Sequence, residues 1–547
     1  MYLTPVLHQL FQRLWHFDVP LVLLGILLLR RTGPIFYRLF IYPYFASPLR
    51  HLPGPKNHHF LIGQTLNQFR SGHPNEPFVS WMRKWPEAPL IRYFDVGNGD
   101  AILITGIEAH KEILHDNVYS FQKPPFFVKL IADIVGFGIG FAEGEEHKKQ
   151  RRSLAALFAT KNLEGFIPLL QNKARRLSQL LDDAIKNDGG ELDIVALYSK
   201  ITLDIMGQFA LGRELDELTT QPPGTNKGTS DTMPFHACYH ELFEPDRVGQ
   251  LLVAINSIFP IRWLPIESNR RFKLAHKTLR NQIQSVIQQR IQELDPNTAS
   301  QFPAENPNAT SDLLIWMITK KYYSSNPQDR WTAPEIRDQL LTFLAAGHQT
   351  TADALTWATF LLTQHPSEAQ RLRDELSSSS LPSNSDEPLT YRALNSLPRL
   401  HNFTREVLRV HCPGINVARQ AIHDVVIQGT LIPKGTTVLM QPAIIHKNPT
   451  IWGDDCDEFR PDRWEEMGEE DDAWKFAAFS HGPRICIGRT FSMLEFKVLM
   501  VEIVRGWRFA RVEGDERGAG EIKLVNPSPM LRPDGGLRVR VERAEPV

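Results

Sequence analysis

A glycine-rich turn that leads through a single cysteine into a helix constrains this chain more than any other feature. The segment over residues 479–488 reads Phe-Ser-His-Gly-Pro-Arg-Ile-Cys-Ile-Gly. Residues 487–507 are rich in helix formers and carry apolar side chains at helical spacing, so we expect Cys486 at or just before a helix N-terminus. The unpaired amides and the positive end of the helix dipole at such a position lower a thiol pKa. Cys486 is therefore predicted to be a thiolate ligand of a metal.

Three other residues of this turn have geometric reasons to be there. Gly482 lets the backbone turn without a Cβ clash, and Gly488 allows the next helix to lie close to a flat cofactor. Arg484 is placed to reach an anionic group on that cofactor. A lone cysteine is otherwise a buried small hydrophobe, or a nucleophile that needs a nearby histidine. The five fixed positions of Phe-x-x-Gly-x-Arg-x-Cys-x-Gly, however, should coincide by chance in fewer than roughly one chain in a thousand.

This turn resembles the haem-binding loop of the cytochrome P450 family. The resemblance implies haem b as the cofactor, with Cys486 as the axial thiolate ligand of its iron. It also implies that Arg484 binds a haem propionate and that the ring of Phe479 shields the sulfur. The resemblance covers the chain from about residue 53 to the C-terminus, with its motifs in the family's order.

A second motif lies in the middle of a long predicted helix. Residues 332–335, Thr-Ala-Pro-Glu, form a capping box, and no other proline follows before Pro366, which predicts a helix of roughly 30 residues. Residues 345–351 within it read Ala-Ala-Gly-His-Gln-Thr-Thr. Small residues there can simply admit a crossing helix while Thr350 bonds the carbonyl four residues back. The run also resembles the family's oxygen-binding helix, in which the residue at the Thr350 position hydrogen-bonds the bound dioxygen and steers proton delivery.

Gln349 departs from the family's pattern, because an Asp or Glu is usual at this position. An amide cannot move protons by titrating. If Gln349 and Thr350 form the catalytic pair that the resemblance implies, proton delivery relies on the threonine hydroxyl and on ordered water.

Two further segments resemble the family's propionate-binding elements. Residues 144–151 form a charged helical turn, which on its own indicates a solvated face. The segment resembles an aromatic-x-x-x-Arg element, with His147 where Trp is common and Arg151 as the arginine, and the resemblance implies that both bind a haem propionate. Arg419 matches another propionate-binding arginine, just before a hairpin predicted over residues 425–438 with its turn at 432–435.

Glu406 and Arg409 lie three residues apart on one face of a predicted helix. Most such pairs are exposed and contribute little to stability. The surroundings here are apolar, and the segment Phe-Arg-Pro-Asp-Arg-Trp over 459–464 resembles the family's meander. By resemblance Glu406, Arg409 and Arg463 form a buried structural triad that stabilises the thiolate side of the protein.

The composition excludes several classes of protein. The 547 residues carry a net charge of −1, which gives no reason to expect nucleic-acid binding. The four cysteines show no paired spacing, so neither a disulfide framework nor a zinc site is indicated. A reducing compartment is the best match.

The N-terminal segment is the most apolar part of the chain. Residues 19–29 are uncharged and end at Arg30-Arg31, with further positive residues up to Lys56. A short or tilted membrane anchor is expected, and the positive-inside rule then keeps the body of the protein cytosolic. A cleaved signal peptide is the alternative, but no clear small-x-small cleavage site follows. We expect residues 1–50 to be an anchor and interfacial segment at the endoplasmic reticulum, and residues 51–547 to be one catalytic domain beyond a Pro-Gly-Pro joint.

The fold class is predicted to be mainly α with a smaller β region, which is the cytochrome P450 fold with an added anchor. Residues 90–93 and 101–104 have the pattern of strands, and most of the remainder up to residue 410 has the pattern of helices. Three polar connectors, over residues 219–234, 295–311 and 377–388, are interpreted as surface loops of one domain.

The predicted function is a membrane-anchored haem-thiolate monooxygenase acting on a hydrophobic small molecule by hydroxylation or epoxidation. The overall pattern suggests fungal secondary metabolism, with a terpenoid or polyketide substrate. The resemblance implies electrons from NADPH through NADPH-cytochrome P450 reductase, with cytochrome b5 as a further candidate donor. A haem-thiolate isomerase or dehydratase without a reductase and a non-enzymatic haem protein are the alternatives. The expected pocket lining is residues 124–141, Phe343, residues 415–417 and residues 528–530.

Overall fold

The computed structural model describes residues 21–215, 233–243, 247–294, 312–382, 387–467, 473–512, 522–526 and 528–545. The connectors expected over residues 219–234, 295–311 and 377–388 lie wholly or partly outside the described residues. Residues 19 and 20, which begin the apolar N-terminal segment, lie outside them as well.

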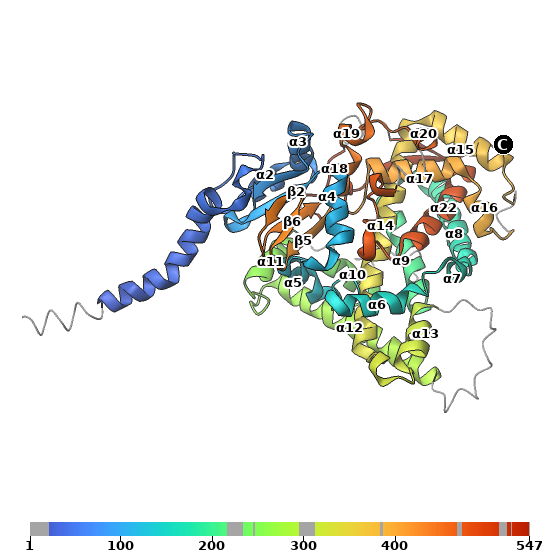
Figure 1. The fold of residues 1–547 in the computed structure, drawn as a ribbon. Coiled ribbons are helices and arrows are strands. Elements are labelled where there is room, and N and C mark those ends of the chain that lie inside the picture. Colours follow the sequence, from blue (N-terminus) through green and yellow to red (C-terminus); the bar gives the residue numbers. More distant parts are fainter. Residues whose placement is uncertain are drawn as a thin grey trace, which may run out of the picture.

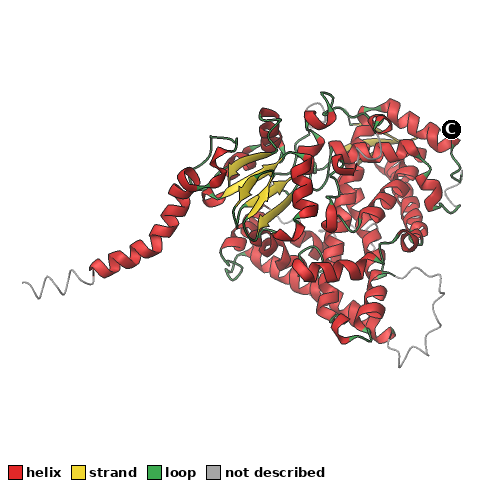
Figure 2. Ribbon diagram, in the orientation of Figure 1, coloured by secondary structure: helices red, strands yellow, loops and turns green. Residues whose placement is uncertain are grey.

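Helices form most of the described chain and strands a smaller region, as the sequence predicts (Figures 1 and 2). The main helices are α2 (Thr65–Arg70), α3 (Glu76–Lys84), α4 (Ile107–Lys111), α5 (Pro125–Val135), α6 (Gly144–Ala155), α7 (Thr160–Glu164), α8 (Ile167–Asp188), α9 (Ile194–Leu211), α10 (Phe235–Phe243), α11 (Arg247–Ile258), α12 (Glu267–Glu293), α13 (Leu313–Met317), α14 (Ala333–Gln364), α15 (Pro366–Ser378), α16 (Tyr391–Asn395), α17 (Pro398–Val410), α18 (Pro442–His446), α19 (Pro449–Trp452), α20 (Arg463–Glu466) and α22 (Arg489–Gly506).

Helix α14 is the axis of the helical body. The predicted capping box is present: Thr332 Oγ1 accepts from the amide of Glu335, and the Glu335 carboxylate accepts from the amide of Thr332 at 2.7 Å. The helix runs for 32 residues and ends before Pro366, close to the predicted length. It packs against α9, α12, α17 and α22, and its apolar side chains belong to the largest core cluster of the protein. A site in the middle of α14 is therefore held by helices from distant parts of the chain.

A five-stranded mixed sheet lies between the N-terminal segment and the helical body (Figure 2). Its order is β1 (Leu90–Phe94), β2 (Asp100–Ile104), β8 (Thr437–Met440), β5 (Val417–Ala421) and β3 (Phe121–Gln122). Strands β2 and β8 run parallel, and the other neighbours are antiparallel. A second sheet joins β4 (Glu191–Asp193), β10 (Arg538–Arg543) and β9 (Trp507–Arg511).

The predicted hairpin over residues 425–438 has a different turn from the one expected. Strands β6 (Val425–Ile427) and β7 (Thr430–Ile432) pair with each other, and the chain turns at Gln428 and Gly429, which both have positive φ. The Pro-Lys-Gly sequence at 433–435 instead directs the chain into β8, which pairs with β5. A turn is present at Lys434 and Gly435, within the expected 432–435, but it connects β7 to β8. The hairpin itself turns earlier because the Gln-Gly pair supplies the left-handed conformation that a two-residue hairpin needs.

The described part of the N-terminal segment begins with a helix over residues 21–36, which projects from the body (Figure 1). The helix continues as a π-helix, η1 (Tyr37–Ala46). The large apolar side chains of residues 21–29 are each more than half exposed. Among the described residues, α9 is the one helix long and apolar enough to cross a membrane; 67% of it is buried, which is typical of a core helix. The Pro-Gly-Pro joint packs along β1, where Pro53 O accepts from the amide of Arg92 at 2.8 Å.

Candidate active site

A cavity of about 360 Å³ separates the middle of α14 from the Cys486 turn. Ala346, Gly347 and Thr350 line it from α14, and Cys486 lines it from the turn. The amide of Cys486 donates to Phe479 O at 2.9 Å and closes the turn, and α22 begins three residues later, as the sequence predicts. The sulfur is accessible from the cavity, so the thiol and the helix motif face one shared space.

Glycine is present at positions 482 and 488 of the turn for different structural reasons. Gly482 has φ +69°, and a Cβ there would lie 2.0 Å from Leu114 O, so only glycine is tolerated. A Cβ on Gly488 would meet only Cys486 Sγ and Ser492 Oγ, at ordinary contact distances. The protein's own packing therefore does not require glycine at 488. A flat group placed against this wall of the cavity would require it.

Burial raises the pKa of the Cys486 thiol, contrary to the prediction of a lowered value. The Gly488 amide and the charge of Arg151 favour the thiolate, but the loss of hydration deep in the protein outweighs them. A bound metal ion deprotonates a coordinating thiol outright, so ligation rather than the helix end would supply a thiolate at Cys486. Among the described residues no three His, Cys, Asp or Glu side chains gather as a metal site.

A smaller hollow of about 150 Å³ beside Cys486 is strongly cationic. It gathers the predicted His147, Arg151, Arg419 and Arg484, together with Lys123, which the sequence analysis missed. None of the described residues that line it carries a carboxylate. The structure thus brings all four predicted propionate-binding residues to one place.

The cations of this hollow form hydrogen bonds or ion pairs with residues around it, and these partners are backbone carbonyls or one carboxylate. Arg151 donates to Ile485 O at 2.6 Å, and Arg419 donates to Ala418 O at 2.8 Å. Arg484 and Lys123 share the carboxylate of Glu143. Four positive groups therefore face a single negative one.

The pKa directions of these groups report the same excess of positive charge. Burial, followed by the charge of Arg484, lowers the pKa of Arg419 to about 10. Burial lowers the pKa of Lys123 to about 8, although Glu143 opposes the shift. Burial and the neighbouring cations lower the pKa of His147 to about 4, so its ring is neutral near pH 7 and bonds Tyr119 Oη at 3.3 Å. The two carboxylates of a haem match a hollow with this imbalance.

Thr350 and Gln349 lie on different faces of α14. Thr350 lines the cavity and donates its hydroxyl hydrogen to Ala346 O at 2.8 Å, the local bond that the sequence allows. Its oxygen remains able to accept a hydrogen bond from the cavity. The side chain of Gln349 is buried, donates to Asp353 Oδ1 at 2.8 Å and is not among the residues that line the cavity. The structure therefore places Thr350, and not Gln349, in the wall of the cavity that Cys486 also lines.

Glu495 is a buried acid next to the cavity that sequence reasoning missed. It belongs to α22 and is fully buried, and its carboxylate accepts from the hydroxyl of the cavity-lining Thr351 at 3.2 Å. Burial raises its pKa to about 8, with the Thr351 bond opposing the shift. Glu495 is thus a neutral acid near pH 7 that connects α22 to α14.

Glu495→Gln is expected to remove a pH dependence of stability. The folded chain keeps a proton on Glu495 up to about pH 8, whereas the unfolded chain releases it near the ordinary carboxyl pKa. The free energy of unfolding of the wild type should therefore fall by about 1.4 kcal/mol for each pH unit within this window. Urea unfolding at about pH 6 and about pH 8 tests this, with the exposed Glu542→Gln as control. An equal fall in Glu495→Gln would contradict the assignment.

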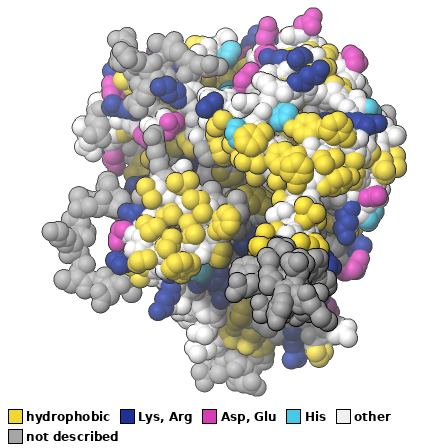
Figure 3. Space-filling model, turned by 90° about the vertical axis from the view of Figure 1, so that its left-hand side faces the viewer, with side chains coloured by type: hydrophobic (Ala, Val, Ile, Leu, Met, Phe, Trp, Pro, Cys, Tyr) yellow, Lys and Arg dark blue, Asp and Glu magenta, His cyan; other side chains and the backbone are white. Residues whose placement is uncertain are grey.

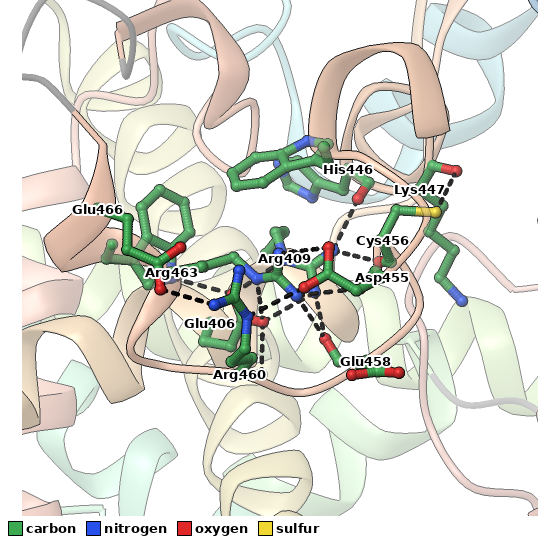
Figure 4. A network of polar contacts seen from close by, with 12 residues as sticks. Glu406, Arg409, His446, Lys447, Asp455, Cys456, Glu458, Arg460, Arg463 and Glu466 are labelled. Carbon is green, nitrogen blue, oxygen red and sulfur yellow. Dashed lines mark hydrogen bonds and ion pairs between the residues drawn. The ribbon is translucent and has the colours of Figure 1, made fainter.

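Glu406, Arg409 and Arg463 meet in a buried network (Figure 4). Arg409 forms two bonds of 2.8 Å to the two carboxylate oxygens of Glu406, and Arg463 Nε donates to Glu406 Oε1 at 2.9 Å. Arg409 also donates to His446 O at 2.8 Å, and His446 Nε2 accepts from the amide of Ala477, two residues before Phe479. The network is thereby connected to the start of the Cys486 turn.

The apolar wall of the cavity was predicted in part. Phe343 lines it, as do Ile139 and Gly140 from the expected 124–141 segment and Asn416 and Val417 from the expected 415–417 segment. Residues 528–530 do not; Met530 instead forms a bridge with Gly414. Helix α9 contributes Met206 and Phe209, which no local pattern marked as pocket residues.

Comparison with known proteins agrees with this geometry. The cytochrome P450 family model matches residues 53–531, and the chain belongs to that family. It is a haem-thiolate monooxygenase. The cytochrome P450 monooxygenase sphH of Aspergillus fumigatus is 30% identical over 87% of this chain and 86% of its own length. The monooxygenases FUM15 of Gibberella moniliformis and ALT8 of Alternaria alternata are 29% and 28% identical, each over 92% of this chain and over 89% and 91% of their own lengths.

Proposed function

We propose that this enzyme inserts one oxygen atom into a hydrophobic small molecule, by hydroxylation or epoxidation. The observation that carries the proposal is the placement of the Cys486 sulfur and the Thr350 hydroxyl around one apolar cavity. When bound, the haem would supply dioxygen activation with two electrons and two protons, which a thiolate ligand favours. The similar proteins are fungal monooxygenases, which supports a fungal enzyme of this kind. Its proposed place is secondary metabolism, on a terpenoid or polyketide skeleton.

The residues of the site divide between holding the cofactor and handling protons. Cys486 would ligate the iron, with Phe479 beside its sulfur and Gly482 and Gly488 shaping the turn. His147, Arg151, Arg419 and Arg484 would bind the propionates, joined by Lys123. Thr350 would hold a proton donor or water at its hydroxyl oxygen, and Gln349 would support α14 through Asp353 without entering the cavity.

Electrons would come from NADPH through NADPH-cytochrome P450 reductase, or from cytochrome b5. A surface hollow of about 570 Å³ on the outer side of the Cys486 turn supports a protein partner of negative charge. Arg405, Arg489 and Lys497 line it, and among the described lining residues there is no Asp or Glu. Phe479 and Ile485 line it as well, so a partner seated there would lie close to the thiolate ligand.

The N-terminal segment would anchor the catalytic domain, residues 51–547, on the cytosolic side of the endoplasmic reticulum. Residues 21–29 of the anchor segment 1–50 expose apolar side chains along a projecting helix. Figure 3 views the side from which this helix projects, and apolar side chains gather on it. Helix α11 packs against α5 near that side, and Leu251, Phe259 and Trp263 in and after α11 are more than half exposed. Release of the full-length protein from membranes by alkaline carbonate would contradict a spanning anchor.

Thr350→Ala is expected to uncouple NADPH consumption from product formation. The variant should keep haem and substrate binding, because Cys486 and the propionate hollow are unchanged, while electrons pass into hydrogen peroxide. Product formed per NADPH should fall at least about tenfold, since a positioned proton donor is lost. The measurement is product, NADPH and peroxide in the reconstituted system with reductase.

Two variants make this test specific. Thr350→Ser keeps the hydroxyl and should keep coupling. Thr356→Val removes the same kind of hydroxyl-to-carbonyl bond from α14 at a position that does not line the cavity, and should also keep coupling. Unchanged coupling in Thr350→Ala, or product formation without any reductase, would favour a haem-thiolate isomerase or dehydratase instead.

A further inference from the structure

The described wall of the cavity is apolar except for a few hydroxyl groups, the Cys486 thiol and one amide. No charged side chain is among the described residues that line it. The hydroxyls of Thr342 and Thr350 donate to carbonyl groups of α14, and the hydroxyl of Thr351 lies within hydrogen-bond distance of Gly347 O and of the Glu495 carboxylate. Ser480 and Ser492 belong to the Cys486 turn and to α22. Asn416 is the remaining polar side chain, and the only amide in the wall.

Asn416 is fixed by the sheet rather than by a mobile loop. It directly precedes β5, and the pairing of Val417 with Met440 places it opposite Gln441, the next residue beyond β8. Gln441 is 1% exposed, and its Nε2 donates to Asn416 Oδ1 at 2.9 Å. The amide oxygen is therefore occupied, and the Asn416 NH2 group has no hydrogen-bond acceptor among the described residues.

An amide NH2 group that faces an apolar cavity discriminates between ligands. A ligand without an acceptor would remove this group from water and leave it unpaired, which costs free energy, whereas an oxygen acceptor would satisfy it. The preference for a ligand with an oxygen acceptor is strong, because only a ligand without one leaves the buried NH2 group unpaired.

We propose that Asn416 anchors the substrate through a hydrogen-bond acceptor, and that the substrate is a neutral, apolar skeleton that already carries a carbonyl, ether or hydroxyl oxygen. The inference rests on the proposed monooxygenation and names its substrate class. The enzyme then acts after a reaction that has introduced oxygen into the skeleton, and not on a bare hydrocarbon. The anchored oxygen would fix which carbon faces the reacting centre.

Matched probes test the proposal in the holoenzyme. Cyclic hydrocarbons and their ketones and alcohols, in three ring sizes, are titrated while the haem absorption change reports the dissociation constant. The ratio of hydrocarbon to ketone dissociation constants in the wild type should fall about threefold to tenfold in Asn416→Leu, the value of one hydrogen bond. Asn416→Asp offers only acceptors, so it should lose the ketone preference and keep binding of the alcohol.

Thr342→Val is the matched control, because its hydroxyl lines the same cavity but already donates to Asp338 O at 2.8 Å; the ratio should not change. The spectrum of the reduced protein with carbon monoxide is recorded first for every variant. Loss of the thiolate spectrum would count against the proposed haem site and not against Asn416. With that spectrum intact, failure of every ketone to bind better than its hydrocarbon, or a ratio that survives Asn416→Leu, would overturn the proposal.

Discussion

Cys486→Ala is expected to abolish thiolate-ligated haem and, with it, all monooxygenase activity. Cys486 is the one cysteine whose sulfur is accessible from the cavity, whereas Cys238, Cys412 and Cys456 are buried elsewhere. Among the described residues that line the cavity there is no second cysteine, histidine or carboxylate to replace it. The reduced protein with carbon monoxide should therefore lose the long-wavelength Soret band that a thiolate ligand produces.

The other cysteines are the controls for this result. Cys412→Ala and Cys456→Ala remove buried thiols that are not among the residues lining the cavity. Both variants should keep the band. A band that persists in Cys486→Ala, or one that disappears in Cys412→Ala from a protein that still binds haem, would show that the ligand has been assigned to the wrong residue.

The sequence predicts well those parts of the site that depend on residues close together in the chain. The capping box and the absence of proline define α14, and the turn before α22 places Cys486 within three residues of the observed helix start. These features depend on neighbours in the chain, which the sequence displays directly.

The parts that sequence does not predict depend on pairs of residues far apart in the chain. Lys123 joins Arg151 and Arg484 in the cationic hollow from separate segments, and Glu495 meets Thr351 across two helices. The Asn416 amide is oriented by Gln441 only because β5 and β8 happen to pair in that register. No spacing along the chain marks such contacts, since each residue alone has the pattern of an ordinary polar side chain.

The thiol illustrates how burial overrides a correct local argument. The turn does place Cys486 before a helix N-terminus, where the amides favour a thiolate. Desolvation acts in the opposite direction and is the larger effect. Burial depends on the whole fold, so the sign of this pKa shift could not be obtained from the motif.

Glu406→Gln is expected to destabilise the protein more than any other single change of a charged residue outside the haem site. The carboxylate is fully buried and accepts from Arg409, Arg463, Trp464 and the backbone amide of Arg460. Replacing it leaves two buried guanidinium groups facing a neutral amide, at a cost of about 3 to 5 kcal/mol. Arg409 also donates to the carbonyl of His446, whose ring accepts from the amide of Ala477 near the Cys486 turn. The variant should therefore bind less haem as well as being less stable.

Asp462→Asn is the matched control, because Asp462 also joins two arginines, Arg399 at 2.6 Å and Arg371 at 3.2 Å, but its side chain is 42% exposed. Solvent screens such a pair, so its loss should cost no more than about 1 kcal/mol. Urea unfolding and the haem content of purified protein compare the two variants, and Glu406→Asp serves if Glu406→Gln does not fold. Equal losses of stability in the Glu406 and Asp462 variants would mean that burial does not set the strength of the triad.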